Sequence, residues 1–171
     1  MDEDKLNRLP PDVKKQFVKL AEKLSEKKQK TKVHDDFLTF VKHVWPEFIE
    51  GAHHKKIAEK FNDIANKKIK RLIINMPPRH TKSEFASFLL PAWMVGRRPN
   101  LKIIQSTHTT ELAIRFGRKA KTLMDSPEYK QVFDTRLRED SQAAGKWETQ
   151  QGGEYYAAGV GSAITGRGAD L

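Results

Sequence analysis

The chain has 171 residues, of which 37% are hydrophobic and 32% charged, with no cysteine and a net charge of +10. This length allows one domain with its own core, and the composition is typical of a soluble globular protein. The absence of cysteine excludes disulfides, thiolate metal sites and cysteine nucleophiles, and it suits a reducing compartment. No apolar run is long enough to cross a bilayer, and the polar start is unlike a signal peptide, so no membrane partner is expected.

The positive charge is distributed along the whole sequence. Residues 1–32 hold ten Lys and Arg against six Asp and Glu, and residues 33–171 hold 22 against 16. A basic protein favours a polyanionic partner, because Lys and Arg that neutralise phosphates release counterions on binding. Colloidal solubility explains the same excess of charge equally well.

The first predicted element is a helix over residues 10–30. Val13, Phe17, Leu20 and Leu24 recur at spacings of four, three and four, and lysines fill the other faces. This amphipathic pattern predicts a helix with a solvated lysine face, and a docking helix for a partner or for DNA is the alternative. We therefore expect residues 1–32 to form a basic helical extension of a domain made by residues 33–171.

The rest of the chain alternates between helical and strand patterns. Helices are expected at residues 37–44, 52–65, 83–93 and 111–124. Buried strands are expected at residues 71–75 and 101–105, which are short apolar runs with β-branched residues. The resulting order of strand, helix, strand and helix implies a parallel crossover. Pro91 is expected to kink or end its helix, and the Gly- and Tyr-rich region after Pro127 predicts short strands and turns.

Residues 76–83, Met-Pro-Pro-Arg-His-Thr-Lys-Ser, lie between the first of these strands and a helix. A phosphate-binding loop of the form G-x-x-x-x-G-K-[ST] has this context, but Met76 and Thr81 stand at its two glycine positions. The prolines lack an N–H, so a phosphate cradle must use the main-chain N–H groups of residues 79–83. Because the β-branched Thr81 resists a positive φ, we expect the loop to follow an unusual path.

A second string, residues 161–168, has both glycines at Gly161 and Gly166 but lacks the lysine and the hydroxyl. Only three residues follow it, whereas residues 76–83 run into a convincing helical pattern. Context therefore favours residues 76–83 as the phosphate-binding candidate. A plain helix N-terminus explains the same residues, and the string alone leaves both interpretations open.

From about His34 to Leu171 the chain resembles the large terminase subunit of tailed bacteriophages, the motor that packages DNA into the procapsid. The resemblance is carried by the core R-L-I-I-N-x-P-P-R-H-x-K-S, the apolar helix that leads to P-A-W, the second strand and the T-G-R-G turn. In that family the loop is a deviant Walker A motif. The resemblance implies an α/β fold, a P-loop NTPase-type core with a mainly parallel sheet flanked by helices.

The resemblance also implies ATP and Mg²⁺ as cofactors. Lys82 would contact the β- and γ-phosphates, Ser83 would bind Mg²⁺, and Arg79 would be catalytic, stabilising charge that develops on the γ-phosphoryl group. A surface cation with no catalytic duty is the alternative for Arg79. The remaining residues that the resemblance places in the nucleotide-binding loop are Pro78, His80 and Thr81.

Three further sets of side chains are candidates for binding. His53 and His54 match the region that, in the family, helps to enclose the adenine, and structural histidines are the alternative. The helix at residues 111–124 carries a basic ridge that would meet DNA phosphates, or is a solvated face. The members of this ridge are Arg115, Arg118 and Lys119. Ser106, Thr107 and Thr109 precede this helix and are better explained as capping residues.

Beyond Leu171 the resemblance implies a strand ending in the Walker B carboxylates, then the rest of the ATPase and an endonuclease domain. The chain thus reads as the front part of an ATPase, truncated before the Walker B strand and expected to be nearly inactive alone. In the complete protein the partners would be double-stranded DNA, the portal protein, the small terminase subunit and further copies on the portal, in the host cytoplasm. Two rivals remain open, a helicase-like P-loop translocase and a non-catalytic DNA-binding or assembly module whose loop is vestigial.

Overall fold

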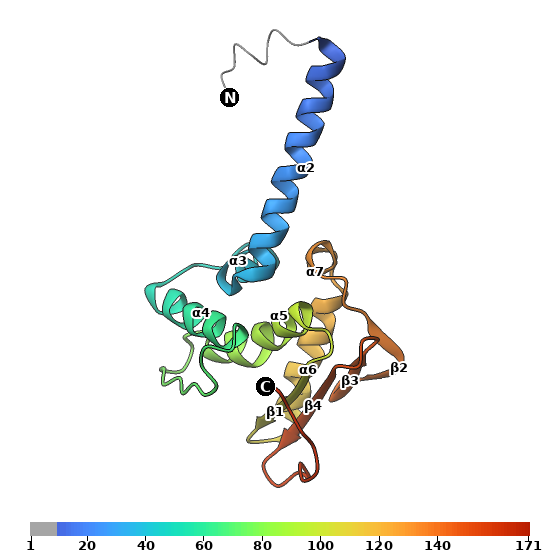
Figure 1. The fold of residues 1–171 in the computed structure, drawn as a ribbon. Helices are drawn as coiled ribbons and strands as arrows, with labels where there is room; N and C mark the ends of the chain where they lie inside the picture. Colours follow the sequence, from blue (N-terminus) through green and yellow to red (C-terminus); the bar gives the residue numbers. More distant parts are fainter. Residues whose placement is uncertain (1–9) are drawn as a thin grey trace.

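The computed structural model describes residues 10–171, and residues 1–9 of the predicted extension lie outside the described residues. Helices from the first part of the chain pack on one another and on helix α6, Thr110–Asp125, which packs on a four-stranded mixed sheet from the second part (Figure 1). The chain is therefore an α/β protein, as the sequence predicts. Among the helices of residues 10–171, none combines the length and the apolar character needed to cross a bilayer.

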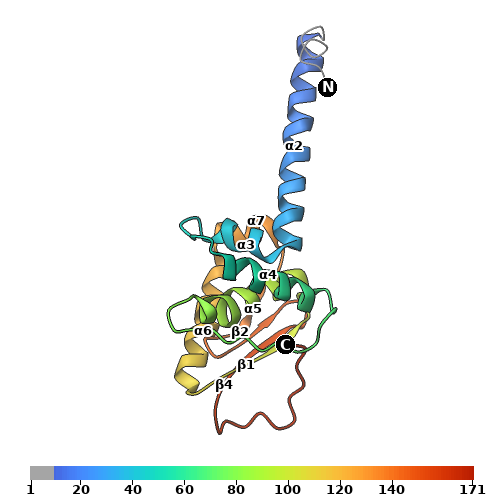
Figure 2. The same ribbon diagram turned by 90° about the vertical axis from the view of Figure 1, so that its left-hand side faces the viewer.

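Helix α2, Pro11–Asp35, projects away from the rest of the protein (Figures 1 and 2). Proline occupies its first turn, where a missing N–H costs no hydrogen bond. Val33 is its buried residue, whereas Phe17 is 37% and Leu20 57% exposed. The predicted helix is confirmed and runs five residues further than its expected end, and most of its apolar stripe faces solvent.

Helices α3, Phe37–Val44, and α4, Ala52–Ala65, begin and end where the sequence predicts. Asp36 caps α3 by accepting a hydrogen bond from Thr39 N at 2.8 Å, and it accepts a second from Asn62 Nδ2 of α4 at 2.8 Å. Burial would raise the pKa of Asp36, but these hydrogen bonds, a third from the Thr39 hydroxyl and the charge of Lys42 lower it overall. One carboxylate thus caps α3 and fixes it against α4.

A continuous helical stretch forms the centre of the core. It consists of a π-helix, η1, Glu84–Leu89, followed by α5, Leu90–Arg97. The N–H of Leu90 donates to Phe85 O, five residues back instead of four, as in a π-helix. This change in hydrogen bonding comes just before Pro91, which has no N–H to donate. The helix therefore continues through the proline. Around it, Phe37 packs edge-on against Phe85 and Trp93, with ring centroids 5.4 Å apart in each pair.

The sheet has the order β1-β4-β3-β2. Its strands are β1, Lys102–Thr107, β2, Leu137–Ala143, β3, Lys146–Thr149, and β4, Glu154–Gly159. Only β1 and β4 pair in parallel, whereas β4–β3 and β3–β2 are antiparallel. The prediction of a mainly parallel sheet is therefore wrong, because short turns join β2 to β3 and β3 to β4, and a short turn can join only antiparallel neighbours.

Two helices connect β1 to β2, namely α6, Thr110–Asp125, and α7, Pro127–Val132. Helix α6 was predicted, and Thr109 caps it by accepting from Leu112 N at 3.3 Å. It packs along β4 and β1 and buries Phe116 and Ala120. Helix α7 was not predicted, although Ser126 as N-cap followed by proline is a helix-start signal.

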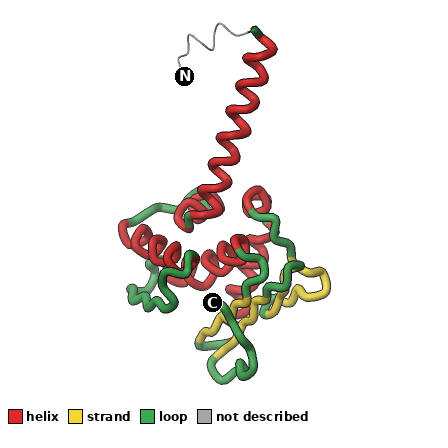
Figure 3. Tube along the Cα trace, in the orientation of Figure 1, coloured by secondary structure: helices red, strands yellow, loops and turns green. Residues whose placement is uncertain are grey.

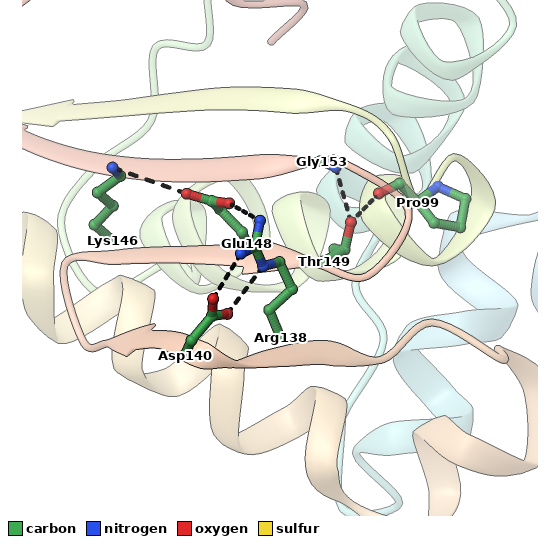
Figure 4. Close-up of polar contacts among 7 residues, drawn as sticks. All are labelled: Pro99, Arg138, Asp140, Lys146, Glu148, Thr149 and Gly153. Carbon is green, nitrogen blue, oxygen red and sulfur yellow. Dashed lines mark hydrogen bonds and ion pairs between the residues drawn. The ribbon is translucent and has the colours of Figure 1, made fainter.

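Polar contacts hold the antiparallel strands (Figure 4). Arg138 on β2 contacts Asp140 at 2.6 Å and reaches across to Glu148 on β3 at 3.1 Å. The hydroxyl of Thr149 donates to Pro99 O and accepts from Gly153 N at 2.8 Å, so it ties the turn after β3 to the loop before β1.

The predicted strand at residues 71–75 is not part of the sheet. The segment is extended and belongs to the long loop between α4 and η1 (Figure 3). Leu72 and Ile74 are partly buried, whereas Ile73 is 86% exposed. Within residues 10–171 no main-chain hydrogen bond joins the segment to a strand. Alternating burial is present, but no neighbour supplies the ladder that would make it an interior strand, so the predicted crossover to β1 is wrong as well.

The outer edge of β1 is occupied by the last residues of the sequence. Asp170 N donates to Lys102 O at 2.8 Å, and Ile104 N donates to Leu171 O at 3.0 Å. This pattern is that of a parallel pair. A hollow lined by Leu72, Ile74 and Leu171 lies between these residues and the extended segment.

Candidate phosphate-binding loop

The loop at residues 77–81 connects the extended segment to the start of the central helix, which begins at Lys82. The first helical hydrogen bond runs from Phe85 N to Thr81 O at 2.9 Å. Within the described part of the chain, the N–H groups of residues 79–83 donate to no other main-chain or side-chain group. Five consecutive donors are thus unused at a helix N-terminus, an arrangement that suits an anion.

Two residues of this loop have a left-handed backbone, Arg79 with φ 64° and Thr81 with φ 60°. The expectation that Thr81 would avoid a positive φ is wrong. Each such non-glycine residue costs about 1–3 kcal/mol, which other contacts must offset. Of the two positions where the motif has glycine, Thr81 therefore takes the left-handed backbone that glycine adopts freely, whereas Met76 does not. Main-chain N–H groups brought together by left-handed residues can form a concave anion site.

The charges around the loop are positive. Lys82 Nζ lies 3.4 Å from Met76 O, and neither Lys82 nor Arg79 forms an ion pair with the described residues. The nearest acid in sequence, Glu84, is held by Lys119 of α6 at 2.5 Å. Cationic side chains beside unused N–H groups give the loop a field that attracts phosphate.

His54 is built into this loop although it lies 27 residues earlier in the sequence. Its Nδ1 accepts from Gly51 N at 2.8 Å, and its Nε2 lies 2.6 Å from Thr81 Oγ1. Burial, followed by the charges of His53 and His80, lowers the pKa of His54, so the ring is neutral near pH 7. Nothing in the local sequence marks this contact.

His53 lies beside His54 and His80, with ring centroids 3.8 Å and 5.9 Å away. Its Nε2 is buried without a hydrogen-bond partner. The structure therefore brings both histidines of the predicted pair to the loop. His54 is occupied by Thr81, whereas His53 has a buried ring nitrogen without a partner.

Ser83 is exposed at the start of the helix, and in residues 10–171 no cluster of three or more His, Asp or Glu side chains suits a metal ion. Mg²⁺ commonly binds through one or two protein oxygens together with phosphate oxygens and water. The residues present thus fit a triphosphate well, and they offer Mg²⁺ the hydroxyl of Ser83 as its protein ligand. Arg79, four residues before Ser83, is exposed. The carbonyl oxygen of Pro78 lies 2.9 Å from Nδ1 of His80.

The three residues of the predicted DNA-binding ridge differ in their surroundings. Arg115 and Arg118 are exposed on α6. Lys119 is half-buried, bound to Glu84 and placed 4.8 Å from the centroid of the Phe88 ring. The ridge therefore presents two available guanidinium groups, whereas its third cation is engaged.

The competing string at residues 161–168 has a different geometry. Gly161 and Gly166 have φ values of 85° and 84°, and residues 160–171 contain no helix. Arg167 is held by Glu154 at 2.7 Å and lies over the Tyr156 ring. Of the two candidates only residues 76–83 lead into a helix, as the sequence context predicts.

Fold and loop together define an α/β protein with a candidate anion site at a helix N-terminus. No protein-family model, curated protein or solved structure matches the chain. The function is therefore argued from the loop itself and from the resemblance in its sequence.

Proposed function

We propose that residues 79–83 bind the triphosphate of ATP, and that the chain is the ATP-binding part of a terminase-type DNA-packaging motor. One observation carries the proposal, namely five successive unused N–H groups at the start of a helix. The helix dipole and the uncompensated charges of Lys82 and Arg79 add to the attraction for phosphate. The terminase-type motor is supported by the sequence resemblance alone.

The loop residues then have distinct roles. Lys82 binds the β- and γ-phosphates, and Arg79 stabilises negative charge on the γ-phosphoryl group. Ser83 holds Mg²⁺, which when bound neutralises part of the phosphate charge. His53 lies beside His80 of the loop, but its Nε2 is buried, so contact with the nucleoside would require its ring to turn outward.

We expect the binding to be weak and hydrolysis slow. The extended segment that leads into the loop has no main-chain ladder among the described residues, so the shape of the loop depends on the partly buried side chains of Leu72 and Ile74. Among the described residues no group of three or more His, Asp or Glu side chains could hold a metal ion, so no such group positions Mg²⁺ and the attacking water.

The remaining parts of the proposal concern partners. Arg115 and Arg118 on α6 are the groups that would contact double-stranded DNA. In a complete motor the portal protein, the small terminase subunit and further copies of the chain would assemble around it in the host cytoplasm.

The test is the affinity of the 171-residue chain for a fluorescent ATP analogue, with inorganic triphosphate as competitor. Lys82→Ala should weaken binding at least tenfold, because it removes the loop's ammonium. Lys130→Ala, which removes the same charge from an exposed site on α7, is the matched control and should bind as the wild type does. Equal affinity of wild type and Lys82→Ala would instead support the vestigial-loop module.

A further inference from the structure

His54 links the first turn of α4 to the loop through two hydrogen bonds. Its ring accepts one from α4 and donates the other to the loop. The N–H of Gly51, the N-cap of α4, donates to Nδ1 of His54 at 2.8 Å. A ring nitrogen that accepts a hydrogen bond carries no proton, so the neutral imidazole has its proton on Nε2. Nε2 therefore donates to Oγ1 of Thr81, 2.6 Å away.

The hydroxyl of Thr81 continues the same series. It accepts from His54 and donates its own proton to His80 O at 2.6 Å. Every donor from Gly51 N to Thr81 Oγ1 thus has an acceptor. Only the neutral tautomer of His54 with its proton on Nε2 satisfies all three contacts.

The imidazole itself is fixed by packing. The side chain of His54 is buried, and its ring lies against Phe48 and Phe85, with centroids 4.7 Å and 5.0 Å away. The N–H of Phe85 in turn donates to Thr81 O at 2.9 Å. Thr81 is thereby held at its hydroxyl by α4 and at its carbonyl by the central helix.

These contacts bear on a residue whose backbone is strained. Thr81 has φ 60°, a conformation that glycine adopts freely and a β-branched residue avoids. A loop with threonine here keeps this shape only while its surroundings hold it. Within the described residues, the contact of His54 with its hydroxyl and that of Phe85 N with its carbonyl hold Thr81 from outside the loop.

We propose that His54 is a positioning residue of the phosphate loop. Its neutral imidazole clamps Thr81 in the left-handed conformation and so keeps the N–H groups of residues 79–83 in the shape that receives a triphosphate. The inference rests on the proposed function. The contact from His54 explains how threonine can stand where the motif has glycine. His54 affects phosphate binding only through Thr81.

The experiment measures ATP-analogue affinity of the whole 171-residue chain for His54→Phe in two backgrounds. In the wild-type background the substitution should weaken binding about tenfold, because Thr81 loses its clamp. In the Thr81→Gly background it should change affinity less than twofold, since glycine needs no clamp. Equal losses in both backgrounds would mean that His54 supports the fold only, and would overturn the inference.

Two further variants secure the result. Thr81→Val keeps the shape of the side chain without the hydroxyl and should also weaken binding about tenfold, which tests the clamp even if His54→Phe does not fold. Wild-type affinity of Thr81→Val would contradict the inference. His43→Phe makes the same change on α3, where Nε2 contacts Glu128 O at 3.0 Å, and should leave affinity unchanged.

The outcomes separate this inference from the proposed function. If wild type and Lys82→Ala bind the analogue equally, the proposed function fails and the clamp fails with it. If Lys82→Ala loses affinity while His54→Phe keeps it, only the clamp is wrong.

Discussion

The ammonium of Lys119 on α6 lies 2.5 Å from the carboxylate of Glu84, the residue directly after Ser83. The pair connects the helix with the basic ridge to the start of the phosphate loop's helix. It also neutralises the acid nearest in sequence to the proposed triphosphate site. Both side chains are about one-third exposed, so solvent screens part of their attraction.

Lys119→Ala should therefore weaken ATP-analogue binding about two- to fivefold, because it leaves the charge of Glu84 uncompensated beside the loop. The loss should shrink at high salt, and titration calorimetry at two ionic strengths measures it. Adding Glu84→Gln to the variant should restore affinity. A Lys119→Ala protein that binds normally at low salt would show that Glu84 does not affect the site.

Duplex DNA binding should depend on Arg115 and Arg118 rather than on Lys119, since only the two arginines have available guanidinium groups. Replacing both by alanine should reduce the slope of log affinity against log salt by about 1.8, at about 0.9 for each lost phosphate contact. Lys119→Ala should leave the slope almost unchanged. Fluorescence anisotropy across a salt series decides this, and a larger effect of Lys119→Ala would contradict it.

Stability measurements can test the position of the extended segment. Ile73→Thr should change the free energy of unfolding by less than about 0.5 kcal/mol, because the Ile73 side chain is 86% exposed. Ile74→Thr should cost about 1–2 kcal/mol, because Ile74 packs against the core. Urea unfolding compares the two. Similar losses at both positions would indicate the interior strand that the sequence predicts.

The stability of the fold should decrease as the pH falls, because His54 becomes protonated. Burial is the main cause of its lowered pKa, the neighbouring imidazoles of His53 and His80 add to this effect, and Glu50 opposes it. A histidine whose pKa is lower in the folded state favours folding fully above its unfolded pKa, near 6.5. This contribution is lost as the pH falls below 6.5 toward the folded-state pKa.

Urea unfolding at pH 7.5 and pH 5.5 measures this loss. His54→Phe should show a smaller difference between the two pH values than the wild type, because it has no group to titrate at this position. His43→Phe is the matched control and should keep the wild-type difference. Identical pH dependence of wild type and His54→Phe would contradict the assignment.

The elements that can be predicted from the sequence are those whose signals are local. Helices at residues 37–44 and 52–65 and the helix through Phe116 follow from apolar periodicity, which a short window contains. The strand expected at residues 101–105 forms at residues 102–107. The helix expected from residue 83 begins at Lys82, and the cap at Thr109 follows from the residue type just before its helix. The phosphate-loop candidate was found in the same way.

Contacts between residues remote in the sequence decide which extended segment joins the sheet and which strained backbone is tolerated. Residues 71–75 have the pattern of a strand but no ladder, and the order of the sheet depends on partners remote in sequence. Thr81 keeps a left-handed backbone while His54, 27 residues earlier, holds its hydroxyl. Ladder bonds and clamping contacts join distant residues, so their free energies are absent from any local string.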